Sequence, residues 1–576
     1  MNSNTFKLFL IAAGMSSLLA TPAFGEVLSG AGSYDPGQID NSNFTMLKEY
    51  QAKVKYEATK DPAVIEEEVK QKMDLLNTEQ VRFTLNDVEI EGNTVFPTYV
   101  LMRLVDFKIG QRVTINDLIM SANDITDYYQ GKGYLSTVAY LPPQKVEKGK
   151  VKIVVLEGKY GNVQINPGRW ERASFLNRQY LDDNDIAPGK IVNANHLRST
   201  LQNINAEDYM KGSVSFTDNE ESEEYSDVSL DIKDRFPIDI DIRYDNQGRE
   251  LIGTQRGVLY AGMHNLTGHG DKLLGTLAFT RRSIGVGGLY SIPVAKNDTR
   301  LNLGYTYSHV KLGKELKQYD ISGSSHNFFV GLSRRLARGE NYRLYGDLTF
   351  DFRNSSSRWK YDSVYTLPGY RTRTIRASVT DIADDFYGRW LFNGAITGGI
   401  PFLDGTDYNK DRALASNNFV KLNAGVARMQ MLPLNSMALL QVNGQYANRD
   451  LYPSEKLQVG GIASVRGFDE AFALGDYGLT ASLEYRFPIP FLGMVLPDKL
   501  KFIDDSIRLA AFYDFGWFGD RFNPDGSDIM MSVGPGIVVK LTKYLSGNVY
   551  WGFPLGHHAN DVDTCRFHFT VTSNIL

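Results

Sequence analysis

The C-terminal part of the chain, residues 235–576, consists of short segments in which apolar and polar side chains alternate. In residues 479–487, Leu, Ala, Leu, Tyr and Phe take every second position, and Thr, Ser, Glu and Arg stand between them. Neighbouring side chains of a β-strand point to opposite faces, so this period of two indicates strands. Few stretches carry the longer period of a helix, and a mainly β fold is predicted.

The apolar face of these segments distinguishes a membrane barrel from a soluble sandwich. A soluble sandwich buries that face in a dry core. Here the face is aromatic and aliphatic, and aromatic residues often stand near the segment ends, as Trp551 and Phe553 do in residues 545–553. Such ends match the aromatic girdles at the two surfaces of an outer membrane. Beyond the N-terminus no run of 18 or more apolar residues occurs, so only a closed barrel could span a bilayer.

This region contains sixteen candidate strands, an even number, as outer-membrane barrels have. They lie at 238–246, 254–263, 271–282, 285–292, 299–310, 325–335, 341–353, 371–382, 388–400, 418–430, 437–449, 478–488, 507–516, 530–541, 544–553 and 565–575. Connections after odd-numbered strands are mostly the longer ones, including 354–370 and 450–477, while the turn at 489–506 is a long exception on the other side. With the N-terminal part in the periplasm, the longer set falls outside the cell.

The N-terminus is predicted to be a signal peptide covering residues 1–25. Lys7 supplies the positive charge, residues 8–20 are a short apolar run, and Ala23 and Gly25 are small residues before the cleavage site. Residues 26–80 follow, with polar helical candidates at 44–58 and at 63–73. The simplest interpretation of either helix is a solvent-exposed linker.

Residues 81–158 and 159–234 are predicted to form two small α/β modules of order β-α-α-β-β. In the first, strands are expected at 83–90, 136–141 and 150–156 and helices at 99–105 and 115–129, the second helix capped by Asn116 and ended by Gly131 and Gly133. In the second, a strand at 161–165 precedes helices at 172–181 and 194–204 and strands at 213–217 and 227–232.

Several functional classes are disfavoured by composition and motifs. A formal charge of −5 gives no reason to expect nucleic-acid binding. The phosphate-loop pattern GxxxxGK[ST] and the enzyme motifs GxSxG and HExxH are absent from the sequence, so we expect no enzyme activity, no nucleotide hydrolysis, no cofactor and no metal. His557 and His558 are interpreted as a solvated pair. The single cysteine, Cys565, excludes an internal disulfide and is expected to be a small packed side chain.

Specific motifs resemble the transporters of two-partner secretion, the TpsB class of the POTRA–β-barrel superfamily, also called the haemolysin/haemagglutinin secretion-activation family. Residues 91–94, 128–134, 141–144 and 155–158 resemble the first POTRA domain of that class, and 245–248 with Gly253 resemble the entry to its barrel. The positions in the POTRA motifs are Gly92, Asn93, Tyr129, Gly133, Tyr134, Pro143, Gln144, Glu157 and Gly158.

The most specific likeness lies in the long connection 450–477. Val465, Arg466, Gly467 and Phe468 resemble the loop motif that identifies the superfamily, and residues 512–516 resemble its partner motif on the thirteenth strand. By strand parity Asp514 faces the lumen with Arg508, Phe512 and Gly516. The hypothesis is that the loop folds into the barrel and Arg466 pairs with Asp514, while Gly467 and Gly516 permit close approach.

The resemblance implies a sixteen-stranded antiparallel transmembrane β-barrel over residues 235–576, preceded by two POTRA domains in the periplasm and an N-terminal helix. The implied function is secretion, without nucleotide hydrolysis, of a large exoprotein that carries an N-terminal secretion domain. Further partners are outer-membrane lipid and, during biogenesis, the barrel-assembly machinery, and the chain is expected to be a monomer. A helix within residues 26–80 either plugs the pore or remains a linker.

Two other functions stay open at this point. An insertase of other outer-membrane proteins would usually carry three to five POTRA modules, and a passive diffusion porin would carry none. The client itself, whether a haemolysin, an adhesin or a contact-dependent toxin, is not identified by the sequence.

Overall fold

A computed structural model describes residues 35, 40, 65–66, 72–75, 82–105, 108–181, 185–205, 207, 209–218, 224–339, 341–361, 363–403, 405, 415–489, 506–521, 527–542, 544–556 and 564–575. The chain forms two compact units, of which residues 238–266 and 271–576 make up most of one and residues 52–237 most of the other. Among the described residues no helix is long and apolar enough to cross a membrane. The candidate helix at 44–58, His557, His558 and nearly all of the turn at 489–506 lie outside the described residues.

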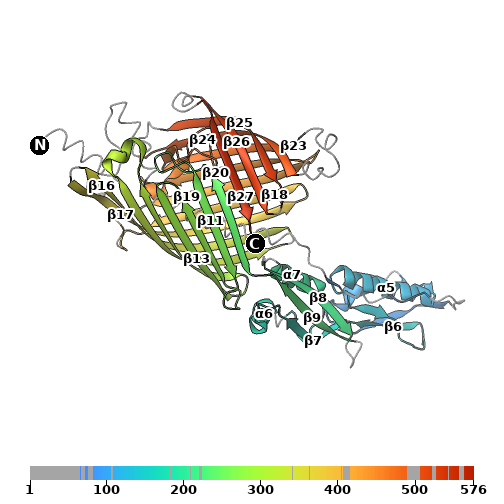
Figure 1. Ribbon diagram of the computed structural model, residues 1–576. Helices are drawn as coiled ribbons and strands as arrows, with labels where there is room; N and C mark the ends of the chain where they lie inside the picture. The colour runs from blue at the N-terminus through green and yellow to red at the C-terminus, as the bar shows by residue number, and fades with distance from the viewer. Residues whose placement is uncertain are drawn as a thin grey trace. The chain divides into compact units, whose positions relative to one another are not determined.

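The first α/β module packs two helices on a small sheet (Figure 1). Its elements are β2 (Phe83–Thr84), β3 (Asp87–Glu91), α4 (Thr98–Met102), β4 (Arg112–Val113), α5 (Ile115–Gly131), β5 (Val138–Tyr140) and β6 (Lys150–Leu156). The strand expected at 83–90 is interrupted, because β2 pairs with β4 whereas β3 pairs with β6. At this change of partner the backbone N–H of Leu85 donates to Gln111, and that of Asn86 to Gly149.

The cap of α5 differs from the prediction. Thr114, and not Asn116, is the N-cap residue, and it forms a capping box with Asp117. The Thr114 hydroxyl accepts a hydrogen bond from the Asp117 backbone at 3.2 Å, and the Asp117 carboxylate accepts one from the Thr114 backbone at 2.7 Å. The prediction failed because a Thr-x-x-Asp pair begins two residues earlier and satisfies two backbone donors at once.

The second module contains β7 (Lys159–Asn166), α6 (Ala173–Tyr180), α7 (Ala194–Ile204), β8 (Met210–Asp218) and β9 (Tyr225–Asp234). An additional strand, β1 (Ile65–Glu66), lies parallel to β8, with Ile65 opposite Val214, so the sheet order is β1-β8-β9-β7. The helix expected at 63–73 is therefore wrong at residues 65–66, and residues 72–75 are not helical either. The backbone there bonds outward, since Met73 exchanges hydrogen bonds with the Asn123 side chain at 3.2 and 3.1 Å.

The C-terminal unit is a closed barrel with sixteen strands in the described part of the chain, each hydrogen-bonded to its neighbours in sequence order, which Figure 1 shows from β10 in green to β27 in red. They are β10 (Ile238–Asp245), β11 (Arg256–His264), β12 (Lys272–Phe279), β13 (Ser283–Ala295), β14 (Thr299–Lys311), β15 (Ser322–Arg338), β16 (Tyr342–Tyr361), β17 (Ser363–Asp385), β18 (Gly388–Gly399), β19 (Val420–Leu432), β20 (Ser436–Ala447), β23 (Tyr477–Pro488), β24 (Ile507–Gly519), β25 (Asp528–Lys540), β26 (Leu545–Leu555) and β27 (Arg566–Asn574). All pairs are antiparallel, including β10 with β27, which closes the barrel.

One predicted connection is instead part of the sheet. The interval 354–370 is not a loop, because β16 and β17 continue as one long hairpin through most of it. The sequence gives no signal for this extension, because a strand that faces water on both sides needs no alternation of apolar and polar residues. Residues 354–357 are accordingly Asn followed by three Ser. The interval 311–324 contains a 3₁₀ helix, η4 (Lys314–Tyr319).

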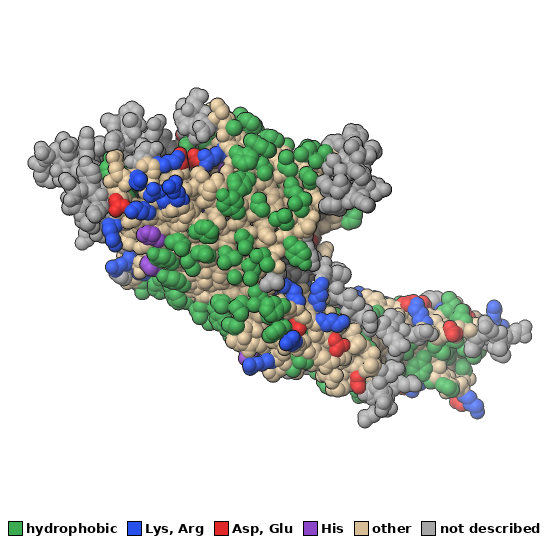
Figure 2. All heavy atoms as spheres, viewed as in Figure 1, with side chains coloured by type: hydrophobic (Ala, Val, Ile, Leu, Met, Phe, Trp, Pro, Cys, Tyr) green, Lys and Arg blue, Asp and Glu red, His purple; other side chains and the backbone are tan. Residues whose placement is uncertain are grey.

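The barrel presents its apolar side chains outward and its polar ones to the lumen. On β23 the outward Leu483 is 50% exposed, whereas its inward neighbour Glu484 is 6% exposed. Hydrophobic side chains form a broad area on the wall in Figure 2. Cys565 was expected to be packed, but it is exposed just before β27 begins.

Candidate functional site

The connection between β20 and β23 folds into a compact structure against the inner wall of the barrel. It contains a 3₁₀ turn, η6 (Pro453–Glu455), and a two-stranded sheet of β21 (Leu457–Val459) and β22 (Ala473–Gly475). Val459, Val465 and Phe468 are fully buried and form a hydrophobic cluster with Met530 of β25. We call residues 450–476 the lumen loop.

Arg466 of the lumen loop and Asp514 of β24 form a buried, bidentate ion pair. The guanidinium Nε donates to Oδ2 of Asp514 at 2.8 Å, and the NH2 group donates to Oδ1 at 2.8 Å. The backbone N–H of Arg466 donates to the same carboxylate at 3.0 Å. Asp514 is 0% exposed and Arg466 is 4% exposed. A planar fork matched to a carboxylate is the strongest geometry available to an ion pair.

Further groups surround the Arg466 guanidinium on all sides. It donates to the hydroxyl of Ser482 at 2.9 Å and to the carboxylate of Glu484, both on β23. The guanidinium carbon lies 3.6 Å from the ring centroid of Phe512 and 4.9 Å from that of Tyr550. Its charge is thus met by two carboxylates and two aromatic faces, which is sufficient to hold a cation away from water.

Glycines allow the loop to approach the wall. A Cβ atom on Gly516 would lie 2.6 Å from Val459 and 2.9 Å from Val465, and one on Gly467 would lie 2.8 Å from Ser532. On β26, a Cβ atom on Gly552 would lie 2.3 Å from the carbonyl oxygen of Arg466. These are distances that real Cβ atoms do not adopt, so a larger residue would displace the loop.

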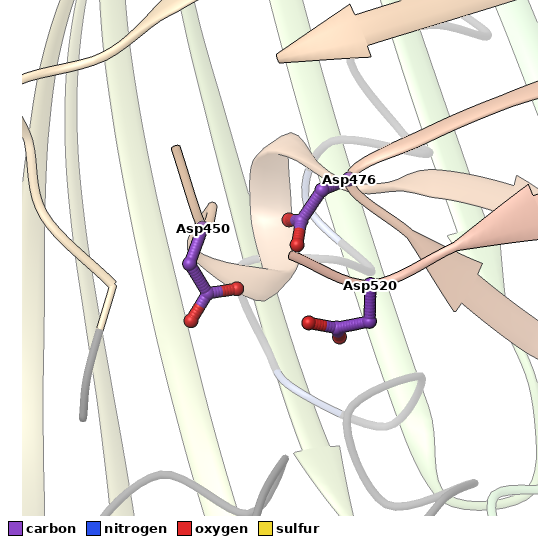
Figure 3. A group of neighbouring side chains, drawn as sticks. All are labelled: Asp450, Asp476 and Asp520. Carbon is purple, nitrogen blue, oxygen red and sulfur yellow. The ribbon is translucent and has the colours of Figure 1, made fainter. Parts of the chain in front are cut away.

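A second cluster fastens the lumen loop at the extracellular ends of its flanking strands. Asp450, Asp476 and Asp520 turn their carboxylates toward one another in Figure 3, with one oxygen of each within 4.8 Å of the others. The ammonium of Lys456 lies 3.1, 3.5 and 2.6 Å from these three groups and is 3% exposed as a side chain. Because Lys456 already supplies the cation, we interpret the cluster as a structural clamp.

The electrostatics of this clamp are unusual. Burial raises the pKa of Asp476 to about 8, and the neighbouring carboxylates add to this against the opposing effect of Lys456. Asp476 also accepts hydrogen bonds from the backbone N–H groups of Leu451 and Arg521, at 2.9 and 2.8 Å. The clamp therefore joins the start and the end of the lumen loop to the residue that follows β24.

Two acidic residues of the N-terminal region contact the barrel wall. Asp40 is helical and 0% exposed, and its carboxylate lies 3.4 Å from Nε of the lumen-facing Arg353. The Tyr370 hydroxyl donates to Asp35. Arg353 also lies 3.7 Å from Glu455 of the lumen loop, so the N-terminal segment and the loop share one cation.

The POTRA motif positions are brought together in the first α/β module, around Glu157. Its carboxylate, 4% exposed, accepts hydrogen bonds from the backbone of Thr94 at 2.8 Å and of Val95 at 3.0 Å, and from the Tyr129 hydroxyl at 2.7 Å. Burial raises the pKa of the Tyr129 hydroxyl, and its bond to Glu157 raises it further. Glu157 thus ties the turn after β3 to helix α5.

The remaining motif positions shape the same module. Gly92 and Gly133 have positive φ angles of 86° and 94°, and a Cβ on Gly92 would lie 2.2 Å from the Val155 carbonyl. The Asn93 side chain donates a hydrogen bond to the Phe96 carbonyl at 2.9 Å, and the ring centroid of Tyr134 lies 5.8 Å from that of Phe96. The Gln144 side chain exchanges two hydrogen bonds with the Lys152 backbone, at 2.7 and 2.8 Å, and Gly158 packs on Ser136. Pro143 is exposed.

Several residues of the site were not predicted as members. Glu484 could have been found, because its strand parity turns a carboxylate toward the lumen beside the expected pair. Tyr550 and His568 could not, since they come from β26 and β27, and His568 reaches the site by an Nε2 contact of 2.7 Å with the Arg466 carbonyl. The Lys456 clamp depends on two connections, the lumen loop and the segment after β24, and has no local signal.

Comparison with known families gives two matches. Residues 224–539 match the haemolysin secretion/activation protein family ShlB/FhaC/HecB, and residues 83–158 match the ShlB-type POTRA domain. The first match spans more than half of the chain and includes the lumen loop together with β23 and β24.

Individual relatives extend over most of the chain. The heme/hemopexin transporter protein HuxB of Haemophilus influenzae strain 86-028NP is 25% identical over 516 residues, covering 86% of this chain and 87% of the relative. The outer membrane transporter CdiB of Escherichia coli strain 536 is 24% identical over 506 residues, covering 83% and 80%. The solved structure of CdiB from Escherichia coli covers 97% of this chain and 100% of its own, with a TM-score of 0.70 at 19% identity, which shows the shared fold.

Proposed function

Because the chain belongs to the ShlB/FhaC/HecB family of haemolysin secretion/activation proteins, we propose that it exports one dedicated exoprotein, recognised by its POTRA modules and passed through its barrel. It is an outer-membrane transporter of the two-partner secretion type, with POTRA domains in the periplasm. Family members are transporters and not enzymes, and we extend this to the present chain, with no nucleotide hydrolysis.

The observation that carries the mechanism is the Arg466–Asp514 pair. A buried pair with 2.8 Å contacts holds the lumen loop against the wall in a defined position. Breaking it would leave one charge buried and uncompensated, which is strongly unfavourable. We propose that this pair is a lock that keeps the lumen loop in one position on the barrel wall. Export through the barrel requires that the loop in its interior takes a defined position.

The N-terminal segment is proposed to plug the resting pore. The support is the buried contact between Asp40 and Arg353 together with the Asp35–Tyr370 hydrogen bond, both made by lumen-side residues of the barrel. Because Arg353 also faces Glu455, departure of the plug would leave Arg353 with an acidic partner in the lumen loop.

Client recognition is proposed to occur by β-augmentation at the second POTRA module. The edge of β8 already carries a parallel strand, with Ile65 opposite Val214 and Glu66 opposite Ser215. The described part of this resident strand, Ile65–Glu66, contributes few backbone hydrogen bonds, so a longer extended client segment can replace it. Replacing Ile65 by proline should then strengthen binding of the exoprotein's N-terminal domain, and weaker binding would contradict this route.

The insertase alternative is less well supported. The solved structure of BamA from Haemophilus ducreyi shares the fold, with a TM-score of 0.52 and 16% identity over 86% of this chain. The family match, however, is to the secretion/activation proteins, and the described residues contain two POTRA-like modules. A passive porin is less consistent still, because the lumen loop occupies the barrel interior.

The test of this function is genetic. We would read the neighbouring open reading frame, delete the gene for this chain, and follow the neighbour's product to the medium or the cell surface. A large exoprotein stranded in the periplasm, and released again by the wild-type gene, is the expected result. Broad loss of other outer-membrane barrels in the deletion strain would support the insertase instead.

A further inference from the structure

The outward faces of β14–β17 carry an ordered boundary near their extracellular ends. Strand register places Tyr305 opposite Phe328, Phe328 opposite Phe352, and Phe352 opposite Arg373. Tyr305 and Phe328 are each 46% exposed. An aromatic row of this kind marks the interface between the hydrocarbon and the headgroups. We call it the boundary row.

Beyond the boundary row the same faces become polar and cationic. The next outward position on each strand gives Tyr307, His326, Asn354 and Arg371, and the positions after it give His309, Ser324 and Ser356, then Lys311, Ser322 and Arg358. Arg358, Arg371, Lys311 and both histidines are exposed. The described side chains of these rows include no carboxylate, although Asp320 of the neighbouring turn pairs with Lys311 at 2.6 Å.

Arg373 is fixed at the junction between the two zones. Its guanidinium lies 5.6 Å from the Phe352 ring centroid and donates to the Arg353 carbonyl at 2.8 Å and to the Asn354 side chain at 2.9 Å. The cation is thus held over the Phe352 ring at the end of the boundary row. Figure 2 shows Lys and Arg side chains gathered on this part of the barrel, with histidines beside them and the hydrophobic area next to them.

The spacing places the cations at headgroup depth. Residues two apart on a strand are separated by about 7 Å. The three polar rows therefore cover roughly the first 20 Å beyond the boundary row, measured along a tilted strand. On the other side of the boundary row, the outward Leu303, Leu332 and Leu348 are 36%, 49% and 48% exposed and offer an apolar strip.

From this arrangement we propose that β14–β17 bind a phosphorylated lipid of the outer leaflet. Arg358, Arg371 and Lys311 would contact the headgroup phosphates, because guanidinium and ammonium groups match phosphate oxygens. The acyl chains would lie along the boundary row and the leucine strip below it. The face lies on the outside of the barrel wall, so it is not on the lumenal path of a client.

A lipid is favoured over a free anion because the cations and the apolar strip are continuous. A free phosphate ion would use the charges alone, whereas an amphiphile uses both zones together. Clusters of Lys and Arg at a membrane surface bind anionic headgroups in this way.

The experiment uses the full-length protein, purified in a neutral detergent, with bisphosphorylated lipid A as the probe. We would compare wild type with the double variant Arg358→Gln, Arg371→Gln, and with Arg334→Gln as the matched control. Arg334 is exposed on the outer face of β15 near its periplasmic end, so its replacement removes one positive charge at the other leaflet, as each of the two substitutions does at the outer leaflet. Heat-modifiable electrophoretic mobility would verify that each barrel is folded.

The double variant is expected to bind lipid A about 25-fold more weakly, since each cation near an anionic surface contributes about a fivefold factor. The control variant should bind bisphosphorylated lipid A as wild type does. Removing the phosphates from the lipid should weaken its binding to wild type as much as the double substitution weakens binding of the phosphorylated lipid. Equal binding of phosphorylated and dephosphorylated lipid would overturn the proposal. So would displacement of the lipid by millimolar inorganic phosphate, which would indicate an anion site.

Discussion

Replacing Arg466 by alanine should release the lumen loop from the barrel wall. The substitution removes both 2.8 Å contacts to Asp514 and the contacts to Ser482 and Glu484. Glu484 would keep Arg486 at 2.6 Å and the Tyr550 hydroxyl at 2.8 Å. Asp514 would keep the backbone N–H at position 466 at 3.0 Å and the hydroxyls of Ser482 at 2.8 Å and Ser532 at 3.4 Å, while it remains fully buried without a cationic partner.

The size of the effect follows from these remaining partners. Removing one partner of a buried ion pair costs about 3–5 kcal/mol, and the backbone N–H and two hydroxyls that stay with Asp514 place this site near the lower value. About 3 kcal/mol corresponds to roughly a hundredfold shift of the loop equilibrium away from the wall. Arg466→Lys should lie between wild type and alanine, because an ammonium cannot reproduce the bidentate fork.

Electron paramagnetic resonance can measure this shift directly. Spin labels at Ala463, which is exposed in the lumen loop, and at Ala511, which is exposed on β24, would report the separation of loop and wall after Cys565→Ser removes the exposed native thiol. Wild type should give one narrow distance distribution and Arg466→Ala a broad one, with reduced secretion by a barrel that still inserts. A narrow distribution and normal export in the alanine variant would refute the lock.

Three further outcomes are expected. Thr114→Ala should lower the stability of helix α5 by about 1 kcal/mol through loss of the capping box, seen as faster amide exchange in α5 of the full chain, and unchanged exchange would contradict the cap. The pKa of Asp476 in the folded protein is raised to about 8. Its contribution to stability is therefore fully present below about pH 4 and is lost as the pH rises to 8. Asp476→Asn should flatten the dependence of Tm on pH, and an unaltered profile would contradict this. Gly516→Ala should overpack the loop by about 1–3 kcal/mol and impair export, whereas Gly394→Ala, with open space at its Cβ, should do neither, and equal effects would contradict close approach at Gly516.

The barrel was accessible to sequence analysis because lipid and water impose a strict period of two. All sixteen predicted strands overlap an observed one, since each needed an apolar outer face and a polar inner face within the membrane. The same reasoning missed the extension of β16 and β17, where both faces are wet. It also missed β1, because two residues that pair with the distant edge of β8 leave no periodic pattern.

The site was only partly accessible for a different reason. Asp514 has a defined strand parity, and Arg466 stands in a loop motif that resembles that of the family, so their proximity could be hypothesised before the fold was known. Lys456, Tyr550 and His568 join the site through packing between connections and strands far apart in sequence. Their roles depend on the closed barrel and not on neighbouring residues.

The most direct test of the account is export by the purified components. The protein would be reconstituted in liposomes with its POTRA modules outward, and the unfolded product of the neighbouring gene would be added without nucleotide. The account predicts that the exoprotein becomes protease-protected inside the vesicles with wild type, and far less so with Asp514→Ala. Insertion of added barrel proteins into the bilayer, without passage of the exoprotein, would contradict it.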